Sequence, residues 1–439
     1  MRHIREDRPI QGLSLPEPRR VQNTCGDQFE GIFMAVRSEH LTPVRRKAPT
    51  ARKKGQTIKK LRRMIAAGQD YYDYNLLAVV ILLTSFGLIM LYSATAYKSM
   101  INSETQSTMS YFGKQTLISI AALGIGFFVS RLDYHYLARF AAPLYEASLV
   151  LLFLTRFIGR EVNGAKRWIY IGPISFQPAE MAKLAVILFI PVLIVKIGKY
   201  IERWKSVFIV LGFGGLTAGF TYIFTQNLST ATIILGIVVA LIFIAHPKTA
   251  PFLKVGAAGL VLLAILLVVL INMSGDGGSF RIQRIQTWLH PEAQAGDNGY
   301  QILQALYAIG SGGFFGKGLG NSTQKLGAIP EAQNDMIFSI ICEELGVFGA
   351  AIVILLFVFM LYRLAMIAQN APDLLGSLIA SGIFIHIALQ VVLNIAVVTN
   401  SIPTTGITLP FVSYGGTSIV FLMVEMGLAL SVSRQIRFR

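Results

Sequence analysis

The sequence predicts an all-α, polytopic membrane protein with about ten transmembrane helices and one long structured outer loop. Of its 439 residues, 54% are hydrophobic and only 14% are charged, which is too little charge for a water-soluble domain of this size. A helix that crosses lipid needs about 20 mostly apolar residues, because only its internal hydrogen bonds can satisfy the backbone there. The chain has ten such windows, near 75–96, 113–131, 136–155, 179–198, 206–224, 228–245, 252–273, 339–364, 374–398 and 415–433.

Residues 1–72 are predicted to form a basic, disordered tail on the cytoplasmic side. Residues 1–63 contain 16 Lys or Arg against 6 Asp or Glu, an excess of 10 out of the formal net charge of +16. Such a block beside a membrane stays on the cytoplasmic side and attracts anionic head groups, and it lacks the interleaved aromatics of a nucleic-acid-binding module. No apolar signal-peptide core occurs before residue 75. Cys25 and Cys342 lie in the tail and in a membrane window, so neither a disulfide nor a metal cluster is predicted.

The distribution of Lys and Arg orients the membrane domain, residues 73–433. The tail, the links that follow the fourth and sixth windows, and the short end 434–439 are basic, so both termini are predicted to be cytoplasmic. The outer loops are then 97–112, 156–178, 274–338 and 399–414.

The outer segment 156–178 departs from this charge pattern. It carries Arg156, Arg160, Lys166 and Arg167 against Glu161. A positive cluster on the outer face predicts an anionic ligand there. Simple solvation of these side chains, or contact with outer-leaflet head groups, is the alternative.

The 274–338 loop is far longer than connections in a compact helical domain need to be, and it has internal organisation. RIQRIQTWL (281–289) predicts an amphipathic surface helix with Trp288 at the interface, and YQILQALYAIG (300–310) predicts a second helix. SGGFFGKGLG (311–320) has five glycines, which permit tight turns and exposed N–H groups. We therefore expect the chemistry of the protein in this loop.

Three long segments resemble the SEDS family (shape, elongation, division and sporulation), which includes FtsW, RodA and SpoVE. They are NGAKRWIYIGPISFQPAEMAKLA (163–185), the run from GYQILQALYAIG to EELGVFGA (299–350), and NIAVVTNSIPTTGITLPFVSYGGTS (394–418). The resemblance covers roughly residues 75–433. PTTGITLPFVSYGG and the Pro-Glu-Ala at 330–332 resemble the division or sporulation branch more than the elongation branch. We favour the division branch, that of FtsW, with an elongation or sporulation paralogue as the alternative.

The chain departs from the family pattern in two places. Gln333 and Asn334 stand where the family usually has His-Thr before its key aspartate, so that aspartate has no titratable neighbour there. Asn227 stands at the acidic position of the family's PDLGTA run, which suggests that an acid is dispensable at this position.

The resemblance implies a peptidoglycan glycosyltransferase of the bacterial cytoplasmic membrane that polymerises lipid II on the outer face, at the division septum. It implies two kinds of protein partner, a class B penicillin-binding protein (a transpeptidase) and other divisome membrane proteins. Older descriptions of the family favour a lipid II flippase, which would distribute polar groups through the spans. The charges of this chain are concentrated outside the windows instead. An ion-coupled carrier and a structural division scaffold are further alternatives.

The chemistry of lipid II sets what such a site needs. Its undecaprenyl pyrophosphate leaves as a stable anion, so the enzyme needs one base for the acceptor hydroxyl and cations for the developing charge. Asp335 matches the family's essential acidic position and is the predicted general base. The predicted substrate-binding residues are Glu331, Lys166, Arg167, Arg281, Arg284, Lys325 and Ser413.

Each of these assignments has a plainer alternative. Glu331, at i, i+4 from Asp335, is otherwise a solvated loop acid, and each cation is otherwise an interfacial anchor. A divalent cation, Mg²⁺ or Mn²⁺, that bridges the pyrophosphate and an acid is compatible with the site. Glu343 and Glu344 are predicted to be interfacial acids, one solvated and one bonded to a neighbouring helix. Lys183 is predicted to pair with Glu180, and Lys317 is a weaker phosphate ligand.

Overall fold

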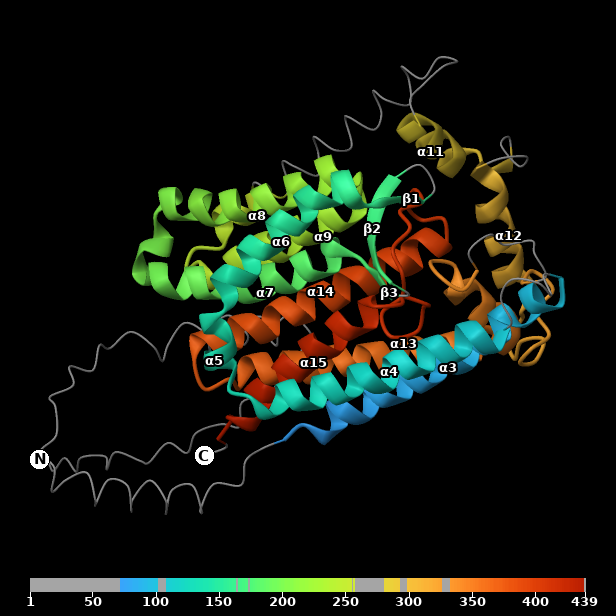
Figure 1. Cartoon of the computed structure of the whole chain (residues 1–439), viewed down its shortest axis with the longest axis horizontal. Coiled ribbons are helices and arrows are strands. Elements are labelled where there is room, and N and C mark those ends of the chain that lie inside the picture. The colour runs from blue at the N-terminus through green and yellow to red at the C-terminus, as the bar shows by residue number, and fades with distance from the viewer. Residues whose placement is uncertain are drawn as a thin grey trace, which may run out of the picture.

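The computed structural model is a bundle of long helices (Figure 1) and describes residues 72–101, 108–162, 165–172, 174–254, 256, 280–292, 298–325 and 332–437. The predicted tail 1–72 therefore lies almost wholly outside the described residues. The bundle consists of α3 (Tyr74–Ile101), α4 (Thr108–Arg131), α6 (Ala141–Ile158), α7 (Pro178–Ile197), α8 (Trp204–Thr225), α9 (Leu228–Ala245), α13 (Ile337–Gln369), α14 (Leu374–Val398) and α15 (Ser418–Arg434).

Eight helices within the described ranges are long and apolar enough to cross a membrane. They correspond to eight of the ten predicted windows, and the chain is a multi-pass membrane protein. The window 252–273 lies almost entirely outside the described residues. The last window corresponds to α15, which has 17 residues. The exact number of spans stays a prediction.

The third span begins later than predicted. The window 136–155 is replaced by a short helix, α5 (Tyr134–Arg139), followed by α6 from Ala141. Asp133 caps α5 by accepting a hydrogen bond from the backbone N–H of His135. The chain therefore turns between α4 and α6 through a short helix that has its own N-cap. A hydropathy window of about 20 residues cannot distinguish this short helix from the span that follows it.

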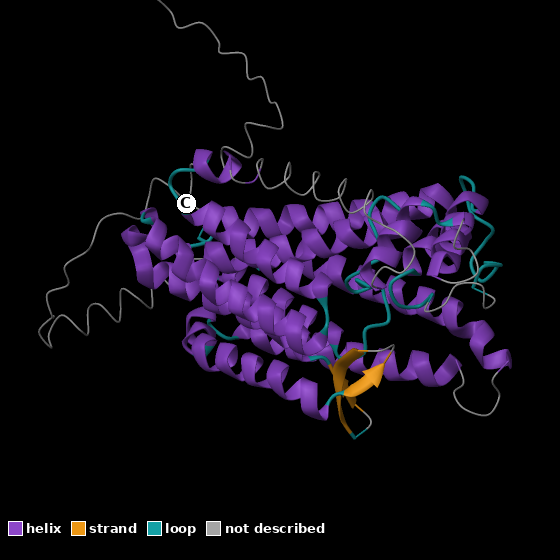
Figure 2. Ribbon diagram, turned by 90° about the horizontal axis from the view of Figure 1, so that it is seen from above, coloured by secondary structure: helices purple, strands orange, loops and turns teal. Residues whose placement is uncertain are grey.

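A small antiparallel sheet occupies the segment 160–176, where the sequence predicts an irregular loop in an all-α protein. Its order is β1 (Arg160–Val162), β2 (Ala165–Ile171) and β3 (Ile174–Phe176). The run Trp-Ile-Tyr-Ile in β2 is rich in aromatic and β-branched residues, which favour strands. Figure 2 shows the strands at the edge of the helix bundle, beside loops.

The elements of the long loop lie on the side of the bundle where the sheet lies. The two helices predicted in the long loop are α11 (Phe280–Leu289) and α12 (Asn298–Ser311), so the presence of both helices is confirmed. Figure 1 places β1, β2, α11 and α12 away from α5, which lies at the other end of the bundle. The 3₁₀ helix η1 (Gly198–Glu202) connects α7 to α8.

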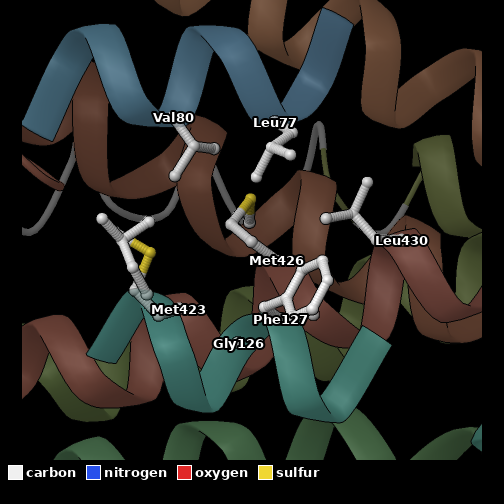
Figure 3. Close-up of a pocket in the computed structure, with 9 residues that line it drawn as sticks. Leu77, Val80, Gly126, Phe127, Met423, Met426 and Leu430 are labelled. Carbon is white, nitrogen blue, oxygen red and sulfur yellow. The ribbon is translucent and has the colours of Figure 1, made fainter. Parts of the chain in front are cut away.

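Small residues let α4 and α15 approach closely. A Cβ atom added to Gly126 would lie 2.6 Å from the carbonyl oxygen of Met423, and one added to Gly427 would lie 2.4 Å from that of Gly126. Beside this contact, Figure 3 shows an apolar pocket lined by Leu77 and Val80 from α3 together with residues of α4 and α15. Its lining has no charged side chain, so we do not expect a polar substrate there.

Candidate active site

Asp335 stands two residues before the start of α13, in a turn held by α14. Its backbone carbonyl accepts a hydrogen bond of 2.8 Å from Asn394 Nδ2, which also donates to the carbonyl of Ile407 at 2.7 Å. Gly406 adopts φ +67°, and a Cβ atom added there would lie 3.8 Å from Asp335 Oδ2. The loop that joins α14 to α15 therefore passes directly beside the Asp335 carboxylate.

Arg284, on α11, is the basic neighbour of Asp335. Its Nη1 donates to the carbonyl of Thr404 at 3.1 Å. Burial lowers the pKa of Arg284, and the negative charge of Asp335 acts in the opposite direction. Trp288 and Asn400 exchange two hydrogen bonds, of 2.9 and 3.3 Å, which fix α11 against the same loop.

Arg167, on β2, completes a cluster of two cations and one acid. Its Nε and Nη2 donate to the carbonyls of Thr225 and Gln226, at 3.4 and 3.3 Å. Burial lowers the pKa of Arg167, and the positive charge of Arg284 lowers it further. The fold thus holds two repelling guanidinium groups near one another, an arrangement that favours binding of an anion.

Lys166 does not belong to this cluster. Successive side chains on a strand point to opposite faces, so Lys166 points away from the face that carries Arg167. On the Arg167 face the neighbours Ala165 and Ile169 are buried, 5% and 7% exposed. Lys166 lies opposite Glu161 in the pairing of β1 with β2.

The structure gives Lys325 a different role from the predicted phosphate contact. Its side chain is buried, and its ammonium donates to Glu344 Oε1 at 2.8 Å, to Ser93 Oγ at 3.1 Å and to the carbonyl of Gly320 at 2.6 Å. These three bonds use all three N–H donors of the ammonium group. The prediction that Lys325 binds pyrophosphate is therefore corrected.

Ser413 is also occupied within the protein. Its hydroxyl accepts a hydrogen bond of 2.8 Å from the backbone N–H of Leu409, and its own N–H donates back to the Leu409 carbonyl at 3.0 Å. The side chain is buried. Ser413 thus closes the turn that precedes α15, and we do not retain it as a substrate ligand.

Glu343 and Glu344 are both fully buried, so the prediction that one of them is solvated is wrong. They lie where α13 breaks at Gly346, φ +68°. Glu343 accepts hydrogen bonds from Lys317 Nζ at 2.7 Å, from Ser322 Oγ, and from the N–H and hydroxyl of Thr323. Glu343 therefore attaches the glycine-rich loop and the residues that follow it to α13.

The glycine-rich loop does not offer open N–H groups at this break. The N–H groups of Lys317 and Gly318 donate to the carbonyls of Glu343 and Glu344, each at 2.9 Å. Val347 and Phe348 donate in turn to the loop carbonyls of Gly313 and Phe314. Lys317 is paired with Glu343, which removes it from the candidate phosphate ligands.

Two further predicted residues are not placed by the structure. Glu331 lies outside the described residues, and of Arg281 only the backbone within α11 is described. Among the described residues, no group of three or more His, Cys, Asp or Glu could hold a metal ion. Mg²⁺ commonly binds one or two carboxylates and completes its shell with substrate phosphates and water, so Asp335 fits only as part of a shell that substrate oxygens complete.

The predicted pair of Lys183 and Glu180 is confirmed, with 2.9 Å between Nζ and Oε1. Lys183 also donates to Gln390 Oε1 at 3.4 Å. Asn227 caps α9 by accepting from the N–H of Thr230 at 3.1 Å, a role that Asn fills as well as Asp. This cap explains why the departure at position 227 is tolerated.

The sequence reading missed Asn394 and Gln390. Gln390 Nε2 donates to the carbonyl of Thr408 at 3.1 Å, next to the carbonyl that Asn394 holds. The available signal was two amides four residues apart in an apolar span, because polar groups within membrane helices are rare and usually face the protein interior.

These features define a class of protein: a multi-pass membrane protein with one aspartate and two arginines gathered where a long loop meets the bundle. The chain belongs to the FtsW/RodA/SpoVE family of cell cycle proteins, whose model matches residues 73–437. It is 38% identical over 376 residues to stage V sporulation protein E of Bacillus subtilis, covering 83% of this chain and 98% of that protein. It is 35% identical over 378 residues to the probable peptidoglycan glycosyltransferase FtsW of Trichlorobacter lovleyi, covering 82% and 93%.

Solved structures of similar proteins share the fold. One match is a chain of a peptidoglycan synthase complex that coordinates polymerization and crosslinking. The TM-score is 0.69 and the identity 28%, covering 83% of this chain and 98% of that chain. The rod shape determining protein RodA of Thermus thermophilus matches with a TM-score of 0.57 and 27% identity, covering 84% and 98%.

Proposed function

We propose that this chain is a peptidoglycan glycosyltransferase that polymerises lipid II, with Asp335 as the general base and Arg167 and Arg284 as contacts of the leaving group. The observation that carries the proposal is the grouping of one carboxylate with two guanidinium groups, because this is the set that a pyrophosphate donor requires. The names of several relatives, probable peptidoglycan glycosyltransferases, support the same class of enzyme.

The reaction follows from these groups. Asp335 takes the proton of the acceptor hydroxyl as its oxygen attacks the anomeric carbon of the donor. The bond from that carbon to the pyrophosphate oxygen breaks on the opposite side, so the configuration inverts. The electron pair leaves with undecaprenyl pyrophosphate, whose charge Arg167 and Arg284 stabilise. A positive neighbour also favours the ionised form of Asp335, which a base requires.

Polymerisation of labelled lipid II by purified protein tests this proposal, comparing wild type with Asp335→Asn. Wild type is expected to form glycan chains, and the isosteric variant is expected to bind lipid II without forming them. Equal chain formation by both proteins would remove Asp335 from the role of base. The reaction needs to be run with and without a class B penicillin-binding protein, the partner class that a similar peptidoglycan synthase complex suggests.

A lipid II flippase is the second candidate, and one observation favours it. Among the described residues, the membrane helices hold buried ionisable pairs such as Glu180 with Lys183 and His386 with Glu425. Such groups within spans are often part of transport pathways. Lipid II translocation in liposomes should therefore be measured for wild type and Asp335→Asn. Translocation by Asp335→Asn would support transport. If neither protein translocates lipid II, polymerisation is the remaining candidate function.

The finer setting of the enzyme also belongs to this proposal. We place it in the bacterial cytoplasmic membrane with both termini cytoplasmic, working at the division septum with other divisome membrane proteins. The identities of 38% to a sporulation protein and 35% to an FtsW do not separate these branches. Rescue of septation in cells depleted of their own FtsW, and failure to rescue spore cortex formation, would support the division branch.

A further inference from the structure

We propose that Asn394 and Gln390 are positioning residues that set where the Asp335 carboxylate stands relative to the substrate. Neither residue is a catalytic group, because neither touches the reacting atoms and each acts through the backbone of another segment. The inference rests on the proposed function, since it takes Asp335 as the base. It adds to that function an account of what holds the base in place.

Asn394 is fully buried in α14. Its NH₂ group has two hydrogens, and each reaches a backbone carbonyl, that of Asp335 at 2.8 Å and that of Ile407 at 2.7 Å. One side chain therefore joins the segment that carries the base to the loop that passes beside it. Only an amide or a cation supplies two such donors at this position, and an amide does so without adding charge.

Gln390, one helical turn away on the same face of α14, extends this attachment. Its Nε2 donates to the carbonyl of Thr408, the residue after Ile407, at 3.1 Å. Its Oε1 accepts from Lys183 Nζ at 3.4 Å, so the amide is itself oriented by α7. Three successive contacts, to residues 335, 407 and 408, thus come from two amides on one rigid helix.

A second observation indicates that Asn394 serves more than stability. Its Oδ1 is buried and has no hydrogen-bond partner among the residues that the structure describes. A buried acceptor without a partner destabilises a protein, so an apolar residue would be preferred if packing were the only requirement. Its presence is explained if the two donors are needed to hold Asp335 and Ile407 together.

Other contacts fix the two segments on either side of this link. Tyr414 N–H donates to the carbonyl of Gln333 at 2.9 Å, and Ser229 Oγ donates to that of Thr405 at 2.7 Å. These bonds keep neighbouring residues in place when Asn394 is changed. The carbonyl of Asp335 itself is held by Asn394, so loss of this amide is expected to let the base shift while the rest of the site stays assembled.

The test is steady-state kinetics of lipid II polymerisation by the full-length chain, comparing wild type, Asn394→Leu and Gln390→Glu. Leu has a similar volume but no donor, and Glu keeps the acceptor for Lys183 while losing the donor to Thr408. We expect kcat to fall about 100-fold in Asn394→Leu, the effect of a displacement of about 1 Å at a reacting group. Removal of one bond in Gln390→Glu should lower kcat by about tenfold. KM should stay within about twofold, because the arginines remain in place.

The pH profile separates positioning from a general loss of folded protein. A displaced Asp335 lies farther from Arg284, so the acid limb of the kcat profile should move to higher pH in Asn394→Leu. Loss of folded enzyme would lower all rates and leave that limb unmoved. Asn370→Leu is the matched control: this asparagine also bonds a backbone carbonyl, that of Met366 at 2.8 Å, at the C-terminus of α13. It should retain wild-type kcat.

Wild-type kcat in Asn394→Leu, with Asp335→Asn inactive, would overturn the inference and leave the proposed function intact. Wild-type activity of Asp335→Asn would instead remove Asp335 from the role of base, which is the part of the proposed function on which this inference rests. If Asn394→Leu does not fold, Gln390→Glu decides the matter, since an unchanged kcat and an unchanged acid limb in that variant would refute positioning by α14.

Discussion

Removing Lys325 should destabilise the protein more than removing Lys317, the lysine of the glycine-rich loop. Lys325→Met keeps most of the side-chain length and removes the ammonium. Glu344 then stays fully buried with only the Ser93 hydroxyl, at 2.7 and 2.8 Å from its two oxygens, to stabilise its charge. Breaking a buried ion pair by removing one partner costs about 3–5 kcal/mol, because it leaves a buried charge without compensation.

Lys317 offers the matched comparison. Its ammonium lies 2.7 Å from Glu343, against 2.8 Å for the pair of Lys325 and Glu344, but 31% of the Lys317 side chain is exposed against 5% for Lys325. Glu343 also keeps bonds from Ser322 and Thr323 when Lys317 is lost. Lys317→Met should therefore cost less, about 1.5–3 kcal/mol at most, the value of one hydrogen bond to a charged group with others remaining.

Thermal unfolding of the purified protein in one detergent measures the difference. The melting temperature should fall in the order wild type, Lys317→Met, Lys325→Met. The double variant Lys325→Met with Glu344→Gln should recover much of the loss, because it no longer buries an unpaired charge. Equal melting temperatures for the two single variants, or no recovery in the double variant, would refute the account of the two pairs.

Three other predictions follow from the described contacts. Arg284→Gln should lower the rate of polymerisation at least about tenfold, because a strong charged contact in the transition state is lost. Lys166→Gln, on the face of β2 opposite to Arg167, should retain activity. The yield of glycan chains distinguishes the two variants. Burial opposes protonation of His135, yet hydrogen bonds to Asp133 and Asp373 and the charges of both raise its pKa. The stability contributed by this site is complete below the ordinary pKa of about 6.5 and is lost as pH rises through the raised value, so His135→Gln should flatten the fall in melting temperature as pH rises above about 6.5. Gly427→Ala, whose Cβ would meet a backbone oxygen at 2.4 Å, should cost about 1–3 kcal/mol, while Gly124→Ala, with no atom within 4 Å, should not lower the melting temperature.

The membrane helices could be predicted from the sequence because length and hydropathy alone decide them. The window 179–198 matches Pro178–Ile197, and 228–245 matches Leu228–Ala245. The two loop helices were predictable for a related reason, since α11 and α12 each carry an apolar face with helical spacing. The sheet was not, because strands of three and seven residues give little periodic signal within a basic segment.

The site was predictable only in part, because a charge in a sequence does not reveal its partner. Asp335, Arg167 and Arg284 come together as expected of a base and its cations. Lys325 has the same formal charge as Arg167 and Arg284 and lies closer to Asp335 in sequence than they do. It nevertheless pairs with Glu344 of α13. Glu344 lies just before the break of α13 at Gly346, and after that break Val347 and Phe348 donate hydrogen bonds to carbonyls of the glycine-rich loop.

The difference between the lysines and the arginines of this region has a physical basis. Lys183, Lys317 and Lys325 each pair with a buried or nearly buried glutamate, so each pair is close to neutral. Burying a neutral pair in the bundle costs far less than burying a lone charge. Such pairs can therefore hold structure, but they leave no net charge for a ligand.

Arg167 and Arg284 are oriented differently, by the backbone carbonyls of Thr225, Gln226 and Thr404. Carbonyl oxygens direct a guanidinium group without neutralising it. The negative charge of Asp335 acts on Arg284, and the positive charge of Arg284 acts in turn on Arg167. An arriving pyrophosphate would offset the positive charge of the two arginines, and the Asp335 carboxylate would accept the proton of the acceptor hydroxyl.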